Sequence, residues 1–174
     1  MKRKDHKALG GYLLDSVGAG DRNRISPLHR RCFLVGCVIP DLLPFTYLRG
    51  WRESRGLRGH DAPYLKKGLE KRLSRLRRFG VSGGRGWFSL GIAMHYLADS
   101  RTYPHTCSFS GGFREHRRYE KELHRCLDRL LQGNERFGFE AGADPSQTPF
   151  SNCVEILQAC TQVFRSVLLE SEKR

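Results

Sequence analysis

The stretch from Gly86 to Ala98, GWFSLGIAMHYLA, has no polar face when it is wound as a helix, so we expect a helix that is buried all round. His95 lies inside this stretch, and Asp99 follows one helical turn later on the same face. Burying an unpaired carboxylate is costly, so Asp99 needs a compensating partner. A bound metal ion would supply it, and the alternative is a hydrogen bond between His95 and Asp99 within the core.

A second pair of the same kind favours the metal ion. An apolar stripe between Phe113 and Leu131 predicts an amphipathic helix, and helical steps extend this stripe back to Glu120 and His116. We therefore expect both side chains to face the core, while His124 at the edge of the stripe is expected to be an ordinary surface histidine. Nitrogen and oxygen ligands in this arrangement are typical of a zinc cluster. The candidate ligands in this half of the chain are His95, Asp99, His105, His116 and Glu120.

The upstream half adds two candidates. Ser26 and Pro27 are a typical helix start, with serine as the N-cap and proline in the first turn. Pro40 should end this helix, and Asp41 follows at once. His60 comes nineteen residues later, in the segment RGHD. Taken alone, Asp41 would be interpreted as a turn residue and His60 as a loop residue.

The order of these residues, H…PD…H…HxxxDxxxxxH…HxxxE, resembles the zinc-dependent phospholipase C family and, more distantly, the related single-strand-specific zinc nucleases. The resemblance runs from His6 to Glu120, and the segment HYLADSRTYPH is its most specific part. In that family three metal ions lie in an all-helical domain. The resemblance implies one zinc site made of Asp41, His60, His95 and Asp99, and a second made of His105, His116 and Glu120.

The resemblance also implies a third site, where His6 joins a bridging Asp99. Secreted members of the family complete this site with the amine and carbonyl of a processed N-terminal residue. Here Met1 and four further residues, MKRKD, precede His6, so the expected cofactors are two zinc ions, with a third that depends on the N-terminus. His6 shares a helical face with Leu9 and Leu13, and Asp5 is positioned to cap that helix.

The function that the resemblance implies is hydrolysis of a phosphodiester by a multinuclear, metal-activated hydroxide. By resemblance Asp41 is both a ligand and the catalytic base. Tyr103 and Phe109 are expected to line the substrate pocket. The enzyme class is then a metal-dependent phosphoric diester hydrolase that resembles phospholipase C, acting on phospholipid or on nucleic acid.

Three alternatives remain open. The same metal core is expected in a single-strand nuclease, where bases would stack on Tyr47 or Trp51. A different metal hydrolase would use adjacent His-Asp ligands, with His29, His60-Asp61 and Asp99. The third alternative is a zinc-stabilised basic binding protein without catalytic activity.

The charge and the composition constrain the partners and the architecture. The net charge is +13, and in the predicted helix from Pro63 to Phe79 lysines and arginines cover the face opposite a leucine stripe. Such a field favours polyanions or an anionic membrane surface. Without a signal peptide or a spanning segment we expect a cytoplasmic protein with reduced cysteines, whose oligomeric state the sequence does not indicate. The predicted fold is an all-α, single-domain bundle over residues 1–174, with about six helices around the metal cluster.

Overall fold

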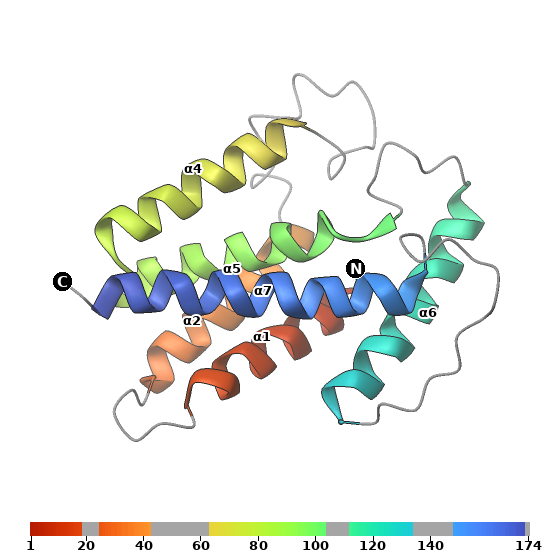
Figure 1. Ribbon diagram of the computed structural model, residues 1–174, viewed down its shortest axis with the longest axis horizontal. Helices are drawn as coiled ribbons and strands as arrows, with labels where there is room; N and C mark the ends of the chain where they lie inside the picture. Colours follow the sequence, from red (N-terminus) through yellow and green to blue (C-terminus); the bar gives the residue numbers. More distant parts are fainter. Residues whose placement is uncertain (19–24, 43–62, 104–111, 134–147, 173–174) are drawn as a thin grey trace.

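The computed structural model describes residues 1–18, 25–42, 63–103, 112–133 and 148–172. The described residues are helical and contain no strand, which confirms the all-α prediction (Figure 1). The elements are α1 (Arg3–Gly18), α2 (Pro27–Val38), the 3-10 turn η1 (Ile39–Asp41), α4 (Pro63–Phe79), α5 (Gly83–Asp99), α6 (Phe113–Leu131) and α7 (Pro149–Glu172).

α5 is the central helix of the bundle, as its lack of a polar face predicts. Every residue from Leu90 to Asp99 is buried, and α1, α2, α4 and α7 all contact this helix. Its carboxyl-terminal end therefore carries His95 and Asp99 into the interior, where the other helices surround them.

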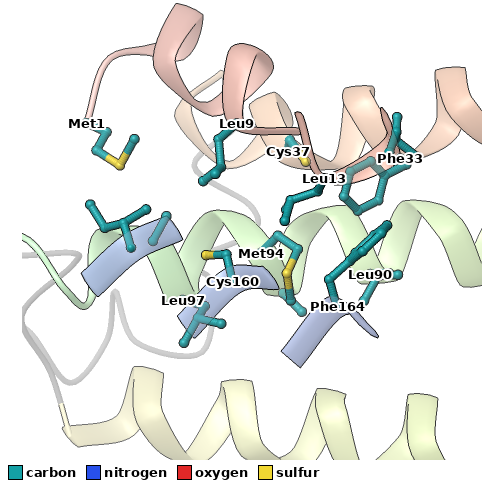
Figure 2. Packing of buried hydrophobic residues seen from close by; sticks show 14 of the residues in the cluster. Met1, Leu9, Leu13, Phe33, Cys37, Leu90, Met94, Leu97, Cys160 and Phe164 are labelled. Atoms are coloured by element: carbon teal, nitrogen blue, oxygen red, sulfur yellow. The ribbon is translucent and has the colours of Figure 1, made fainter. Parts of the chain in front are cut away.

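One hydrophobic core draws buried side chains from each of the six α-helices that the structure describes. Figure 2 shows this core between α1, α2, α5 and α7, with Leu13, Met94 and Phe164 among the labelled side chains. The rings of Phe33 and Phe164 lie 5.1 Å apart between centroids, so α2 and α7 contact one another through aromatic side chains. Met1 belongs to the same core, with an exposed fraction of 7%.

α2 and α5 approach one another so closely that their backbones are in contact. A Cβ atom added at Gly36 would lie 2.3 Å from the carbonyl oxygen of Phe88, and one added at Gly91 would lie 2.2 Å from that of Phe33. Neither distance is possible for a side chain, so only glycine permits this approach. The contact brings the end of α2 beside the ligand-bearing end of α5.

The predicted start and end of α2 are confirmed. The backbone N–H of His29 donates to the Ser26 hydroxyl over 3.3 Å, and Pro27 occupies the first turn. Pro40 lies in η1, where the helix tightens into a 3-10 turn that ends at Asp41. This termination leaves Asp41 at the end of a half-buried helix, whose buried residues are Phe33, Gly36 and Cys37.

Among the described helices none is both long and apolar enough to cross a membrane. The five cysteines that the structure describes are free thiols, and Cys107 lies outside the described residues. A cytoplasmic location stays a prediction.

Candidate metal centre

Four of the predicted ligands come together where three helical segments meet. His95 and Asp99 extend from the end of α5, His6 from the first turns of α1, and Asp41 from η1. One ligand atom from each of these four side chains lies within 4.8 Å of every other. His6, His95 and Asp99 are at most 2% exposed, whereas the Asp41 side chain is 18% exposed. Three of the four candidate ligands are therefore buried, and the cluster reaches solvent at Asp41.

The orientation of His95 is fixed from the side opposite the cluster. Its Nδ1 lies 2.9 Å from the carbonyl oxygen of Cys37, to which it donates. This assigns the proton to Nδ1 and directs Nε2 at the carboxylates of Asp99, at 3.4 Å, and Asp41, at 3.7 Å. A histidine held by a backbone carbonyl in this way is typical of a metal ligand. The close approach of α2 to α5 places Cys37 within reach.

His6 completes the buried part of the cluster. Its ring stacks on His95 with 3.8 Å between centroids, and its Nε2 lies 3.2 Å from Oδ1 of Asp99. Its Nδ1 is buried without a hydrogen-bond partner among the described residues. Two stacked imidazoles around carboxylate oxygens form a donor set that fits zinc, which binds histidine nitrogen and carboxylate oxygen.

The α-amino group of Met1 lies in the same centre. Its nitrogen is 2.9 Å from Oδ1 of Asp99 and 3.7 Å from Oε1 of Glu120. Burial disfavours the charged amine, but the carboxylates of Asp99, Glu120 and Asp41 together outweigh burial and raise the pKa of the amine above its ordinary value. The Met1 amine thus lies beside Asp99 and Glu120, where the resemblance implies an N-terminal amine.

Asp99 is contacted through both of its oxygens. Oδ1 faces the Met1 amine and His6, while Oδ2 faces His95. Burial alone would raise the pKa of Asp99, yet the Met1 ammonium and the two imidazoles hold this pKa well below its usual range. The carboxylate is therefore ionised and accessible from two directions, which is the arrangement expected of a bridging ligand.

The α6 pair lies at the border of this centre. Nε2 of His116 is 3.7 Å from Oε1 of Glu120, and the side chains are 34% and 24% exposed. Both side chains were predicted to face the core, but the structure leaves them only half-buried. Tyr119, Leu123 and Leu127 form the buried face of α6, and His116 and Glu120 lie at the edge of that face. Glu120 adjoins the buried cluster through the Met1 amine.

Several predicted residues lie outside the described residues. Of the ligands, these are His60 and His105, so the structure describes three of the four predicted ligands of one zinc site and two of the three of the other. Phe109 of the predicted substrate pocket, Asp61 of the adjacent His-Asp alternative, and Tyr47 and Trp51 also lie outside.

The sequence analysis missed a hydrogen bond that joins α1 to α6. Nδ1 of His124 lies 2.6 Å from Oδ1 of Asp5, which is 2% exposed, and the backbone N–H of Lys2 donates to the other oxygen over 3.1 Å. His124 is thus a half-buried anchor rather than an ordinary surface histidine. It lies one turn from Glu120, and Asp5 precedes His6, so the pair holds together two helices that carry candidate ligands.

A second polar contact fixes the chain just beyond α5. The backbone N–H of Tyr103 donates to Oδ1 of Asn152 over 3.0 Å, and the Tyr119 hydroxyl donates to the same oxygen. Asn152 is 3% exposed, and burial raises the pKa of the Tyr119 hydroxyl. This contact ties α5, α6 and α7 beside the metal centre. Tyr103 itself is half-buried, and its role in the substrate pocket stays a prediction.

The sequence model of one protein family, described as zinc dependent phospholipase C, matches residues 5–164. The chain belongs to this family. No curated protein and no solved structure matches it. Membership in the zinc-dependent phospholipase C family supports a zinc-dependent phospholipase or phosphodiesterase kind of function, and the donor set of His6, Asp41, His95 and Asp99 agrees with zinc.

Proposed function

We propose that this chain is a zinc-dependent phospholipase C that hydrolyses the phosphodiester bond of phospholipids. The observation that carries the proposal is the sharing of Asp99, whose oxygens face His6 and the Met1 amine on one side and His95 on the other. A carboxylate between two nitrogen-rich groups is the arrangement needed to hold two metal ions close together.

The residues have separate parts in the proposed reaction. His95, Asp41 and Asp99 would hold one zinc, and His6, Asp99 and the Met1 amine another. When bound, zinc supplies a Lewis acid for phosphodiester oxygens and lowers the pKa of a bound water toward about 7. Asp41 is the carboxylate of the buried cluster that reaches solvent, so it is positioned to accept a proton from the attacking water.

A further zinc would lie at His116 and Glu120, with His105 as the third ligand by resemblance. The half-buried state of this pair agrees with a site that opens toward substrate. This gives two zinc ions that depend on side chains alone and a third that depends on the N-terminal amine.

The alternatives differ in how well they fit the centre. Structural zinc sites are closed and four-coordinate, whereas the described residues alone supply six candidate side-chain ligands and an amine. In the adjacent His-Asp alternative, His29 would have to reach Asp99. It stacks instead on Trp87, which precedes Asp99 by twelve residues, or about 18 Å of helix. A single-strand nuclease would use the same ligands, so only the substrate separates it from a phospholipase.

The test combines zinc analysis with two substrate classes. The purified protein is assayed for zinc content, for release of the phosphorylated headgroup from dispersed short-chain phosphatidylcholine, and for cleavage of a single-stranded oligonucleotide. Headgroup release without oligonucleotide cleavage is the expected result. Oligonucleotide cleavage alone would establish a nuclease instead. If zinc-replete protein cleaves neither substrate, the proposed enzymatic activity is wrong.

A substitution then tests Asp41. The D41N variant should lower kcat more than about 100-fold while the zinc bound at Met1, His6, His116 and Glu120 is retained. Asp15→Asn is the matched control, because Asp15 is an exposed carboxylate that pairs with Arg30 at the surface. Equal activity in the two variants would exclude Asp41 from catalysis.

A further inference from the structure

The start of α6 exposes an aromatic ring with an arginine stacked on it. Phe113 is 72% exposed, and the guanidinium of Arg117 lies 4.6 Å from the centroid of its ring. Burying a phenylalanine is favourable by about 1.5–3 kcal/mol, so a ring left this exposed at a helix terminus marks a contact surface when charge surrounds it.

This ring begins a long basic face. The outward side of α6 carries a row of exposed cations, namely Arg114, Arg117, Arg118, Lys121, Arg125 and Arg129. Acidic neighbours are fewer, and the ion pair between Arg118 and Glu122 is a surface contact with a distance of 3.1 Å. The excess of cations along α6 favours an anionic partner.

The same helix carries ligands of the candidate metal centre. Phe113 precedes His116 by three residues and Arg117 precedes Glu120 by three, so each lies beside a candidate ligand on the helix surface. His116 and Glu120 are the half-exposed part of the centre. Anything that binds Phe113, Arg114 and Arg117 would therefore lie at the mouth of the metal centre.

We infer that Phe113, Arg114 and Arg117, here named the α6 rim, dock the protein on an anionic phospholipid surface and so present the metal centre to the bilayer. The inference rests on the proposed function, because the substrate of a phospholipase C lies in the surface on which the α6 rim would dock. An exposed aromatic ring beside arginines suits the membrane interface, where the ring enters the headgroup layer and the guanidinium groups contact lipid phosphates.

The basic helix α4 offers a matched control at the other end of the bundle. Phe79 is 65% exposed, and the guanidinium of Arg78 lies 5.3 Å from its ring centroid. This pair adjoins the start of α5, which is about 24 Å of helix away from Asp99. Figure 1 shows the end of α4 and the start of α6 on opposite sides of the molecule. The two pairs match in composition and exposure but differ in distance from the metal centre.

The test uses the zinc-loaded protein and vesicles of phosphatidylcholine, either alone or mixed with phosphatidylserine. Binding is measured by sedimentation for three proteins: the unmodified chain, the F113A/R117A variant and the R78A/F79A control. The α6 variant should bind the mixed vesicles at least about fivefold more weakly, since one arginine near an anionic surface is worth about that factor. The α4 control should bind like the unmodified protein. Arg117→Glu, which reverses the charge, should weaken binding further.

Hydrolysis separates this inference from the proposed function. The ratio of headgroup release from vesicles to release from dispersed short-chain phosphatidylcholine should fall in F113A/R117A and not in the α4 control. Equal losses of vesicle binding in the α6 variant and the α4 control, or no loss in either, would overturn the docking role of the α6 rim. If the α6 variant loses oligonucleotide binding but keeps vesicle binding, that role is overturned too. Because sedimentation needs no turnover, vesicle binding through the α6 rim by a protein that hydrolyses no lipid would refute the proposed function alone.

Discussion

The α-amino nitrogen of Met1 lies 2.9 Å from Oδ1 of Asp99, although 98 residues separate them in the sequence. The same carboxylate oxygen is 3.2 Å from the imidazole of His6. Met1 and Asp99, the last residue of α5, are therefore in contact in the buried interior. Figure 2 shows Met1 at the edge of the core beside α5.

A chain lengthened at its N-terminus should lose this arrangement. Adding Gly-Ser ahead of Met1 replaces the buried amine by an uncharged amide, whose nitrogen neither forms an ion pair with Asp99 nor binds zinc, so about one zinc ion per chain should be lost. Elemental analysis of this protein against one extended by the same residues at its C-terminus measures the difference. Identical zinc contents would show that the Met1 amine is not a ligand.

Asp99→Asn should be the most damaging single substitution in the centre. It removes the carboxylate that faces His6, His95 and the Met1 amine, and leaves that amine buried beside a neutral amide. Phosphodiesterase activity should fall more than about 100-fold and zinc content should drop. Asp15→Asn again serves as the exposed control, and retention of full zinc by the Asp99 variant would contradict the sharing of this residue.

Alanine at the helix contact should act on the centre without touching a ligand. Gly36→Ala and Gly91→Ala each place a methyl carbon less than 3 Å from a backbone atom of the facing helix. This clash should destabilise the fold by about 1–3 kcal/mol. They should also pull Cys37 away from His95 and weaken zinc binding about 10- to 100-fold. Gly11→Ala in α1 meets nothing within 4 Å and should instead stabilise the fold by about 0.5–1 kcal/mol. Urea titration and zinc competition with a chelator measure the two effects.

His124→Ala should release the N-terminal turn of α1 from α6. Asp5 would keep only its bond from the backbone of Lys2, and a buried carboxylate that loses a partner costs about 1–3 kcal/mol. Zinc affinity should fall as well, since the pair adjoins His6 and Glu120. The exposed Lys121→Ala on the same helix provides the comparison. An unfolding free energy equal to that of the control would remove the proposed anchoring role.

The metal-free protein should be most stable between the ordinary pKa values of Asp99, 3.8, and of the Met1 amine, 8.0. The pKa of Asp99 is lowered by folding, so its stabilising contribution is complete above pH 3.8 and is lost as the pH falls further. The pKa of the amine is raised, so its contribution is complete below pH 8.0 and is lost as the pH rises through the folded value. Urea titrations across the pH range test both limits, and the Gly-Ser extended chain should lack the alkaline decline.

Local patterns predicted much of this structure. The bounds expected for the helices Pro63–Phe79 and Phe113–Leu131 agree with those observed, because both segments carry an apolar stripe of helical period. The inward pair His95 and Asp99 followed from the same reasoning, since two polar groups in a helix without a polar face must be compensated. Whether residues 1–174 form one domain stays a prediction.

Long-range contacts were beyond such patterns. Asp5 and His124 are 119 residues apart, and nothing within either helix indicates that they meet. The contact between Gly36 and Gly91 was missed for a similar reason, because an isolated glycine inside a helical pattern signals only lower propensity. The position of the Met1 amine likewise depends on how α1 packs against α5 and α6. His60, His105 and Phe109 remain predictions, as do the catalytic role of Asp41 and the number of zinc ions.

The glycine contact makes the separation of two helices an independent means of tuning the centre. His95 reaches Cys37 because α2 and α5 approach closely at Gly36 and Gly91, where neither helix carries a side chain. An engineer could therefore keep every donor and change only this gap, which would alter the size of the ion that the donors can surround. Selection among divalent ions depends on such geometry as well as on donor chemistry. Two positions without any polar atom in their side chains would then decide which metal the protein accepts.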